Sequence, residues 1–518
     1  MTTAPPSNSG LISRRHILAV PAAAALAGIG PTPARAEGAT LRVRIGSDIG
    51  NLDPARIFQI ENQTVAGQVF SGLLKYDQKT NKIVPDIATS WAVSDDGLTY
   101  TFKLRQGVTF HKNYGPFTSD DVKFSFDRIL DPAAASSYAG QFADVQSVAA
   151  PDPDTVVITL KGRNSGFPHK VTAFNQGWLL SRKAVGEIGA DKIALNPIGT
   201  GPFVFEKWTP GSEVRLSANP SYFGGAPKID VLLFKLIKDE TAAAIALENN
   251  EIDIFFALQQ PEIIARLRQA KGITLMDRDA NHTLNLMLNM TIKPLDDLRV
   301  RQAIMYAVNR KAIIDGFFKG TKGTAYNVLT PSFVEYTEDV PVYGFDRAKA
   351  AALLKEAGAE GFTLDLVAPG LAPYDKIVVP IAADISAVGI KPNIKVLDRG
   401  AYGQARSKGE IMTALTAVVG PPDPDTPILT LFARKSWPPG LNTSHYAGVE
   451  DLLPKVGPAQ TEADRKAIYK QILAKSMTDL PLVPLYADHL FMAHTANVQG
   501  LVQNSLFTVD CSTVSLKA

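Results

Sequence analysis

The residues of this chain that could perform chemistry are dispersed along the sequence. Seven histidines are present, and His489 and His494 lie five positions apart, which does not place two imidazoles on one helical face. The HExxH pattern of zinc enzymes is absent. The single cysteine, Cys511, has no histidine beside it and is expected to be a buried structural thiol. These spacings predict no zinc or iron site and no cofactor.

Three short strings resemble fragments of known motifs. Residues 46–50, GSDIG, lack the spacing of the G-x-S-x-G nucleophile elbow. Residues 199–201, GTG, are followed by Pro202 and lack the third glycine of a dinucleotide fingerprint, so they are interpreted as a turn that enters a strand. Residues 423–425, DPD, are typical of a turn. The sequence therefore predicts no nucleophile, metal cage or phosphate cradle.

The elements that must position any functional residue begin with a β-α-β unit in residues 230–256. An almost wholly apolar strand, Val231–Ile237, precedes the alanine-rich helix Thr241–Glu248, for which Asp239 is a suitable cap. A second strand, Ile252–Phe256, completes the unit. The nearly continuous apolar run favours a strand covered by helices on each side.

A second unit of the same kind is expected later, with the strands Thr363–Ala368 and Asn393–Leu397. Its helix carries Ile385 on an apolar face, and Pro380 is expected in the first helical turn, where the missing N–H is harmless. Two such units predict two α/β lobes.

Residues 75–196 are interpreted as a small α+β block inserted before the first unit. Trp91–Leu104 is expected to be a β-hairpin that turns at an Asp-Gly pair. Thr118 is expected to cap a helix, with Asp121 completing a variant of the capping box. Ahead of the block, a helix is expected over Asn62–Leu73.

The first 36 residues form a separate segment. Residues 13–18, SRRHIL, match a twin-arginine pattern, and an apolar stretch over Ile17–Ile29 leads to the small-x-small string at 34–36. The pattern predicts a signal peptide, residues 1–36, with cleavage after Ala36. Because a membrane span needs about 20 apolar residues, an uncleaved anchor is the less favoured alternative.

Length and charge limit the class of protein. The 518 residues are enough for at least two cores. Three of the 53 basic residues lie in the predicted signal peptide, which leaves 50 against 51 acidic residues and predicts no binding to nucleic acid or to an anionic membrane. No cysteine directly follows the apolar run, so a lipid anchor is excluded. We expect a soluble periplasmic protein without internal disulfides.

Several long strings resemble one known family, the extracytoplasmic solute-binding proteins of the dipeptide, oligopeptide and nickel class (family 5), which deliver solutes to ATP-driven importers. The strings, in chain order, are NLDPA from Asn51, VFSGLLKYD from Val69, VPDIATSWAVSDDGLTYTFKLRQGVTFH from Val84, FTSDDVKFSFDRI from Phe117, GTGPFVFEKWTPGSEVRLSANPSYF from Gly199, ALENNEIDI, DDLRVRQAIMYAVNRKAII and PDPDTPILTLF from Pro422. An exported α/β protein with two lobes and no catalytic group agrees with this resemblance, because two hinged lobes can close on a solute.

The resemblance implies an α/β, two-lobe periplasmic binding protein fold with a hinge and an extra α+β domain inserted in lobe I, the arrangement called cluster C. The implied ranges are 37–74, 197–284 and 486–518 for the core of lobe I, 75–196 for the inserted domain, 285–485 for lobe II, and Leu284–Asn289 with Pro484–Asp488 for the hinge. The implied partners are ABC permease subunits in the inner membrane with their cytoplasmic ATPases. A monomer without cofactor or catalytic activity is expected.

The string before the Asp-Pro pair departs from the peptide-binding members of the family. In those members a tryptophan and an aspartate precede the pair, and the aspartate binds the free α-amine of the peptide. Here Ala417 falls at the tryptophan position and Gly420 at the aspartate position. Since an unpaired buried ammonium costs several kcal/mol, a free peptide amine would be poorly bound unless Asp423 replaced the missing partner. Nickel binding is similarly weakened, because Val419 and Ser436 stand near the positions of an aromatic residue and a metal-facing histidine.

Candidate ligand-binding residues follow from position in the resemblance. They are Asp423, Trp437, Asn442 and His445 around and after the Asp-Pro pair, Phe58 and Gln59 after the NLDPA loop, and Phe174, Asn175 and Trp178 in the inserted block. His282, beside the expected hinge, is a weaker candidate. For each of them, packing or simple exposure is the alternative role.

The function expected from these observations is a periplasmic solute-binding component of an ABC importer. Its solute would be a small hydrophilic compound, either a peptide or a peptide-like or opine-like compound. Binding of an oligosaccharide or of chelated nickel, a chemoreceptor-linked sensor and a cleft hydrolase are the alternatives.

Overall fold

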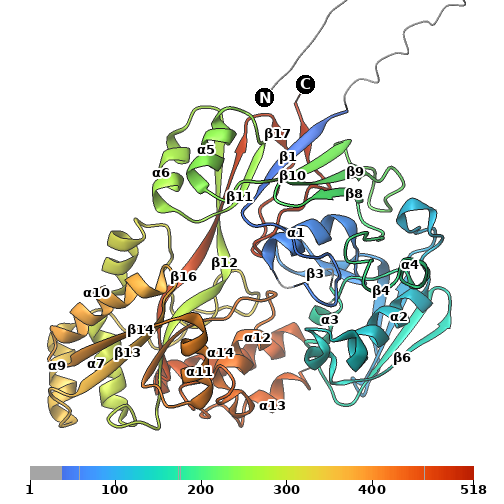
Figure 1. Ribbon diagram of the computed structural model, residues 1–518. Coiled ribbons are helices and arrows are strands. Elements are labelled where there is room, and N and C mark those ends of the chain that lie inside the picture. Colours follow the sequence, from blue (N-terminus) through green and yellow to red (C-terminus); the bar gives the residue numbers. More distant parts are fainter. Residues whose placement is uncertain (1–37, 58, 173, 175–176, 460, 518) are drawn as a thin grey trace, which may run out of the picture. The chain divides into compact units, whose positions relative to one another are not determined.

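The computed structural model describes residues 38–57, 59–172, 174, 177–459 and 461–517 (Figure 1). The expected signal peptide and two candidate residues, Phe58 and Asn175, therefore lie outside the described residues. The chain from Ala39 onward forms one compact unit.

An eight-stranded mixed sheet is the largest sheet of this unit. Its strands follow the spatial order β15-β12-β16-β11-β1-β10-β9-β8. Within it, β1 pairs in parallel with both β10 and β11, and the other pairs are antiparallel. The strand bounds are β1 Thr40–Ile45, β8 Phe203–Thr209, β9 Glu213–Ala218, β10 Val231–Leu236, β11 Ile254–Leu258, β12 Ile273–Leu288, β15 Thr413–Ala417 and β16 Leu482–Thr495.

Helices of very different lengths accompany the sheets. The α-helices are α1 Ile60–Val69, α2 Ser119–Leu130, α3 Phe167–Lys170, α4 Arg182–Ile188, α5 Glu240–Glu248, α6 Pro261–Gln269, α7 Leu298–Ala307, α8 Arg310–Ala312, α9 Arg347–Glu356, α10 Tyr374–Ser386, α11 Arg399–Lys408, α12 Asp425–Phe432, α13 Leu453–Val456 and α14 Glu462–Asp479. Shorter helical turns are η1 His111–Asn113, η2 Pro132–Ala134, η3 Ala139–Phe142, the π-helix η5 Ile313–Phe317 and η6 Arg434–Ser436.

The first predicted β-α-β unit is confirmed. Helix α5 connects β10 to β11, and β1 lies between these two strands. Asp239 caps α5, because its Oδ1 accepts a hydrogen bond of 2.8 Å from the N–H of Ala242. Successive residues of β11 enter different cores, Ile254 packing with α1 and Phe255 packing with α5 and α6. Helices therefore cover both faces of the sheet at this strand. We call this β-α-β unit, together with the strands and helices that pack around it, the first lobe.

Helix α1 ends four residues before the predicted end at Leu73. The prediction is wrong there because Phe70 is already extended and Leu74 begins the short strand β2 (Leu74–Tyr76), which pairs with β3 (Ile83–Pro85). The end of α1 is also where the GTG string packs. A Cβ on Gly199 would lie 2.0 Å from the carbonyl oxygen of Val69, so only glycine fits. Strand β8 begins shortly after, and the turn-and-strand interpretation is confirmed.

The inserted block has its own sheet and core. Its antiparallel strands follow the order β4-β5-β7-β6, with bounds β4 Ala88–Val93, β5 Thr99–Leu104, β6 Val145–Asp152 and β7 Thr155–Leu160. The predicted hairpin is β4 and β5. The predicted helix is α2, and the backbone N–H of Thr118 donates to Asp121 Oδ2 at 3.0 Å, as a capping box requires.

The second predicted β-α-β unit is also confirmed. Strands β13 (Thr363–Pro369) and β14 (Lys391–Leu397) pair in parallel, and α10 connects them. The position of Pro380 was predicted wrongly, since α10 begins at Tyr374 and the proline lies inside the helix. Burial of Ile377 and Val378 in the core accounts for the early start, because this packing outweighs the hydrogen bond that proline removes. We call this region, with α7 to α14, the second lobe.

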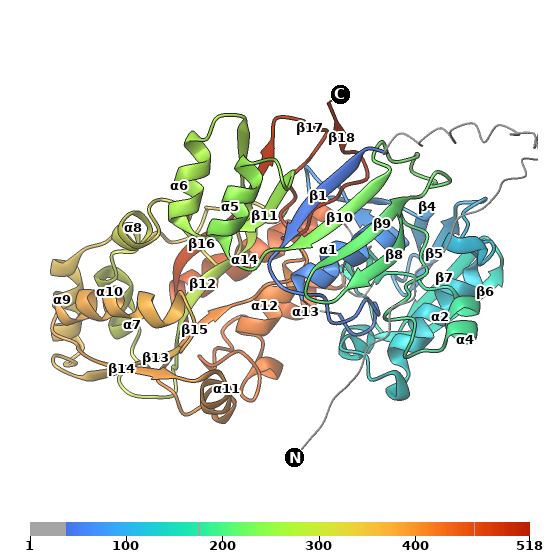
Figure 2. The same cartoon turned by 45° about the horizontal axis from the view of Figure 1, so that its top comes forward.

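Strands β12 and β16 belong to both lobes. Leu286 and Leu485 lie in the core of the second lobe, whereas Phe491 and Met492 lie in the cores of the first. Figures 1 and 2 show the two strands running side by side from one region to the other. The chain therefore has the predicted two-lobe α/β fold. Short strands β17 (Val498–Gln499) and β18 (Ser515–Leu516) pair near the end of the chain.

Candidate functional site

A cavity of about 1040 Å³, here called the hinge cleft, lies beside β12 and β16. These two strands run from one lobe to the other and are called the crossing strands below. The first lobe contributes Gln63 of α1 and Gln260, the inserted block contributes Gln141, and the second lobe contributes Tyr374 of α10 and Thr426 of α12. Because both lobes and the inserted block form its wall, the hinge cleft is the place where closure of the lobes would enclose a solute.

A β-bulge interrupts the crossing strands at the wall of the hinge cleft. Asp279 pairs with His489 and Thr283 pairs with Ala487, so three residues of β12 stand opposite one residue of β16, Asp488. A bulge bends the strand and redirects its side chains. Here the bulge turns His282 toward Asp488.

His282, Asp488 and Lys322 form a buried charge cluster in this wall. His282 Nε2 lies 3.0 Å from Asp488 Oδ2, and Lys322 Nζ donates to Asp488 Oδ1. The side chains are only 9%, 13% and 9% exposed, respectively. Burial alone would raise the pKa of Asp488, but the charge of Lys322 and the hydrogen bond from His282 outweigh it and hold the pKa well below its usual range. Asp488 is therefore a carboxylate.

The loop that carries Lys322 is attached to β16 by two backbone hydrogen bonds. The N–H of Gly323 donates to the carbonyl of Ala487 at 2.8 Å, and the N–H of Ala487 donates back at 2.9 Å. A Cβ on Gly323 would lie 2.8 Å from His489 Nε2, so a side chain at this position would push the loop away. The glycine thus permits the close approach that places Lys322 beside Asp488.

Two positions singled out by the sequence, Ala417 and Gly420, line the hinge cleft. Asn281 of the bulge donates a hydrogen bond from Nδ2 to the carbonyl of Gly420, which ties this segment to β12. Among the described residues that line the hinge cleft, the acidic ones are Glu262 and Asp488. Both are already paired, Glu262 with Lys319 at 2.7 Å and Asp488 within the charge cluster.

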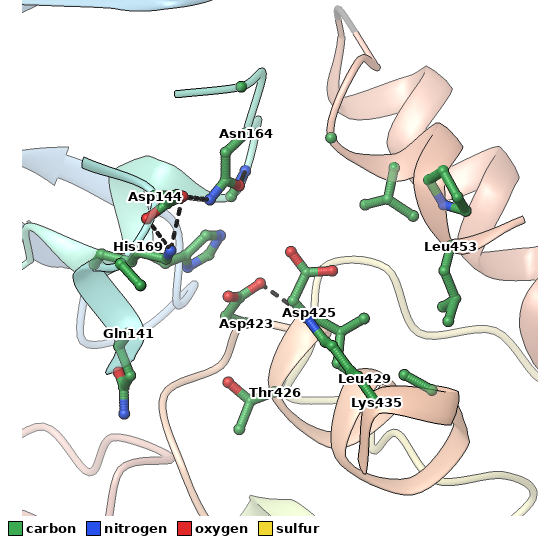
Figure 3. Close-up of a pocket in the computed structure, with 18 of the residues that line it drawn as sticks. Gln141, Asp144, Asn164, His169, Asp423, Asp425, Thr426, Leu429, Lys435 and Leu453 are labelled. Carbon is green, nitrogen blue, oxygen red and sulfur yellow. Dashed lines mark hydrogen bonds and ion pairs between the residues drawn. The ribbon is translucent and has the colours of Figure 1, made fainter. Parts of the chain in front are cut away.

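A second cavity of about 890 Å³ lies between the inserted block and the second lobe (Figure 3). It shares Gln141, Pro421 and Thr426 with the hinge cleft, so the two cavities adjoin. Asp144 on its wall accepts hydrogen bonds from Lys170 Nζ at 2.9 Å and from Asn164 Nδ2 at 2.6 Å.

Three carboxylates surround one guanidinium next to this second cavity. Arg465 Nη2 donates to Asp423 Oδ1 at 2.8 Å and to Asp425 Oδ2 at 3.4 Å, and Arg465 Nη1 lies 3.7 Å from Glu335 Oε1. Burial, and secondarily the charge of Asp423, raises the pKa of Glu335 to about 7. Burial and the nearby Arg465 lower the pKa of His169 to about 3, so its imidazole is neutral.

Trp437, Asn442 and His445 line neither of these two cavities. Asn442 is fully buried and donates from Nδ2 to the carbonyls of Ala433 and Tyr446 at 3.1 and 2.9 Å. Trp437 Nε1 donates to the carbonyl of Tyr446 at 3.0 Å, and its ring lies 5.5 Å from that of His445. The structure gives these side chains a role within their own loop, and contact with a solute stays a prediction.

The remaining described candidates are more dispersed. Asp423 lines the second cavity, where it binds Arg465, and Phe174 lines the hinge cleft. Trp178 is buried in the core of the first lobe. Gln59 is exposed, and its carbonyl accepts from the N–H of Gln63 in the first turn of α1. Whether these residues bind a solute stays a prediction.

Sequence reasoning missed Lys322 and Asp488 and rated His282 low. Asp488 had a detectable signal, since it is the single acid in the apolar run that forms β16. A charge in a buried strand requires a partner. No local pattern identifies Lys322 as that partner, because it lies 166 positions away.

The described residues contain no group of three or more histidine, cysteine, aspartate or glutamate side chains placed to hold a metal ion. Among the same residues, no helix combines the length and apolar character needed to cross a membrane.

Comparison with known proteins gives a consistent result. The family model described as "Bacterial extracellular solute-binding proteins, family 5 Middle" matches residues 82–438. The dipeptide-binding protein of Escherichia coli (strain K12) is 33% identical over 480 residues, which cover 87% of this chain and 89% of that protein.

Two solved structures extend the similarity to nearly the whole chain. HbpA2 from Haemophilus parasuis superposes with a TM-score of 0.86 at 28% identity and covers 92% of this chain and 100% of its own. MoaA from A. tumefacien R10, solved in complex with mannopinic acid, superposes with a TM-score of 0.75 at 26% identity and covers 93% and 100%.

Proposed function

Because the chain belongs to family 5 of the bacterial extracellular solute-binding proteins, we propose that its hinge cleft encloses a small peptide-like or opine-like solute without a free α-amine. Members of this family are periplasmic, non-enzymatic transport proteins. They are the solute-binding components of ABC importers and pass their solutes to a membrane permease, and this is the function of the chain. The proposal concerns the class of solute.

The observation that carries the proposal is that Asp488, the one buried acid among the described residues that line the hinge cleft, is already bound by Lys322. Gly420 occupies the position expected to hold an amine-binding aspartate, and Ala417 occupies that of the accompanying tryptophan. The two lining acids, Glu262 and Asp488, are each bound to a lysine. A buried ammonium would therefore lack a counter-charge, at a cost of several kcal/mol.

The rest of the lining suits a neutral, peptide-like body. Side-chain amides of Gln141, Gln259 and Gln260 can exchange hydrogen bonds with amide groups. Phe174 and Phe507 supply apolar area. A volume of about 1040 Å³ is at the upper end for a small-molecule site, large enough for a short blocked peptide or a conjugate of a sugar and an amino acid.

The names of the similar proteins support both solute types. The E. coli relative is a dipeptide-binding protein, and MoaA was solved with mannopinic acid, an opine. An opine nitrogen is a substituted amine, which keeps its positive charge near neutral pH unless it is acylated, but offers fewer N–H donors than the free α-amine of a peptide. The missing aspartate therefore favours blocked peptides and acylated opines over free peptides.

We also propose that the protein binds without turnover. His282 and Asp488 form a hydrogen-bonded pair of the kind that orients a general base. However, no serine or cysteine occurs among the described residues that line the hinge cleft, so this pair has neither of these two acyl-transfer nucleophiles beside it.

The proposal includes export and assembly. Residues 1–36 would act as a twin-arginine signal peptide, cleaved after Ala36. The mature protein would be a soluble periplasmic monomer without a lipid anchor. Mass spectrometry of the periplasmic protein tests the cleavage site, and light scattering tests the monomer.

A thermal-shift screen of residues 37–518 tests the class of solute. The panel contains free di- to pentapeptides, the same peptides N-acetylated, opines, disaccharides, and nickel with and without histidine. A solute at 100 times its Kd adds about 2.7 kcal/mol to the free energy of unfolding, which is a measurable shift. We expect shifts with blocked peptides or opines. Equal or larger shifts with free-amine peptides would overturn the proposal.

A further inference from the structure

The charge cluster of His282, Asp488 and Lys322 has unused hydrogen-bonding capacity that faces a cavity. We propose that this cluster is a subsite for an acidic group of the solute, a carboxylate in the simplest case. The inference deepens the proposed function and rests on it, because it places one end of the solute at the crossing strands.

Asp488 is already fully engaged by donors of the protein. Its Oδ1 accepts from Lys322 Nζ and from the backbone N–H of His489 at 2.8 Å, and its Oδ2 accepts from His282 Nε2. Three donors thus hold this carboxylate. A cationic solute group placed here would find an acid already neutralised and would lie beside the charge of Lys322. The cluster therefore does not suit an ammonium.

Lys322 has N–H donors that no described residue uses. An ammonium has three N–H groups, and one of them binds Asp488. The structure gives Lys322 Nζ no other hydrogen-bond acceptor among the described residues. Its remaining neighbours are aromatic rings, Phe318 at 5.6 Å and Tyr486 at 5.8 Å from the ring centres. A buried lysine with free donors is completed by an anionic or strongly accepting group.

The second ring nitrogen of His282, Nδ1, is also without a partner among the described residues. Nε2 carries the proton that Asp488 accepts, because a carboxylate can only accept. Nδ1 is buried and has no hydrogen-bond partner in the described part of the chain. The residue is 8% exposed, lines the hinge cleft and packs its ring 5.3 Å from that of Phe507. Nδ1 is therefore an unsatisfied polar atom in the same wall as Lys322.

Matched pairs of solutes test this inference by calorimetry on residues 37–518. Each pair is an N-acetylated dipeptide with a free carboxylate and the same compound as its carboxamide. We expect the acid to bind about tenfold more tightly or better, the scale of one hydrogen bond to a charged group. Lys322→Gln should abolish this preference, because it weakens binding of the acid and leaves binding of the amide unchanged. Lys311→Gln, at an exposed pair with Asp315, should leave the preference unchanged.

Two further variants distinguish loss of the subsite from misfolding of the variant protein. Lys322→Arg keeps the charge and should keep a preference for the acid. The double variant Lys322→Gln/Asp488→Asn removes both buried charges together, so no unpaired ion remains, and it should bind acid and amide equally. Equal binding of acid and amide by the wild-type protein would overturn the inference while leaving the proposed function intact.

A measurement without a cognate solute separates the two claims. If no pair binds, the blocked-peptide form of the proposed function fails, and the subsite is then decided by NMR of the His282 ring nitrogens during addition of sodium acetate, with sodium chloride at equal ionic strength as the control. A shift of the Nδ1 signal with acetate, lost in Lys322→Gln, supports the subsite. No shift with acetate overturns it.

Discussion

His282 and Asp488 face each other at the β-bulge between Asp279 and Thr283, one of two places where β12 and β16 lose their register, with 3.0 Å between Nε2 and Oδ2. The same strands carry the cores of both lobes. The carboxylate that joins Lys322 and His282 therefore fastens together the bulge, the loop of Lys322 and β16 at the wall of the hinge cleft.

Replacing Asp488 with Asn should destabilise the protein strongly. The substitution leaves Lys322 buried without its counter-charge, and breaking one partner of a buried ion pair typically costs about 3–5 kcal/mol. Denaturant unfolding monitored by circular dichroism measures the change. Asp315→Asn, which breaks an exposed pair with Lys311, is the control and should have little effect. Similar small losses for both variants would show that the cluster does not stabilise the fold.

Glu335 should make the free energy of unfolding depend on pH. Its pKa is about 7 in the folded protein and 4.5 ordinarily, so the folded state holds the proton more tightly. The stabilisation is complete below pH 4.5 and is lost as the pH rises to 7, by an amount on the order of 2–3 kcal/mol. Glu335→Gln lacks this loss and should gain stability relative to wild type across that window. A constant difference between the two proteins from pH 4.5 to 7 would contradict the assignment.

His169 should act in the opposite direction. Its pKa is about 3 in the folded protein and 6.5 ordinarily, so its contribution is present above pH 6.5 and is lost as the pH falls toward 3. The free energy of unfolding of His169→Gln should therefore rise relative to that of the wild type as the pH falls from 6.5 toward 3. The opposite signs of the two variants, measured by chemical denaturation at several pH values, distinguish these groups from a general effect of pH.

Restoring an aspartate at position 420 should change the class of solute. Gly420→Asp supplies the missing counter-charge for a free α-amine in the wall of the hinge cleft. A Cβ there would lie 2.9 Å from Thr426 Cγ2, so the variant is combined with Thr426→Ser. Free-amine peptides should then bind at least about tenfold more tightly than to the Thr426→Ser protein, as measured by calorimetry. Gly50→Asp adds the same charge at an exposed position and should change nothing.

Asn442 should matter for the fold of its loop. Its side chain donates to two carbonyls and accepts from Ser444 Oγ at 2.8 Å, all in a fully buried position. Asn442→Ala leaves these groups unsatisfied and should cost about 1–3 kcal/mol in denaturant unfolding. Should the variant keep its stability and lose solute affinity, Asn442 would be a ligand residue as the sequence predicts.

Much of the fold was predictable because its signals are local. Asp239 caps α5, Thr118 and Asp121 close a capping box, and the Asp-Gly turn makes a hairpin, each within a few residues of sequence. The errors lie where distant packing outweighs local preference. Phe70 already leaves the predicted helix, which lets Leu74 begin β2 and pair with β3, and Pro380 is tolerated in α10 because Ile377 is buried in the core.

The candidate site was less predictable because its contacts are long-range. His282 and Asp488 meet through a bulge, and the position of a bulge follows from how two strands pair rather than from either sequence alone. Lys322 reaches them because Gly323 pairs with Ala487 across the cleft wall. In contrast, Gly420 and Ala417 could be placed from the resemblance, since they lie within a few residues of the Asp-Pro pair.

The most direct test of solute capture by the hinge cleft is one calorimetric titration of an N-acetylated peptide acid or an opine into residues 37–518, with recovery of the solute afterwards. We expect one solute per chain, recovered chemically unchanged, and an affinity that falls in Lys322→Gln. Binding confined to free-amine peptides, or a solute recovered as a different compound, would contradict the central claim that the hinge cleft captures an amine-blocked solute for transport.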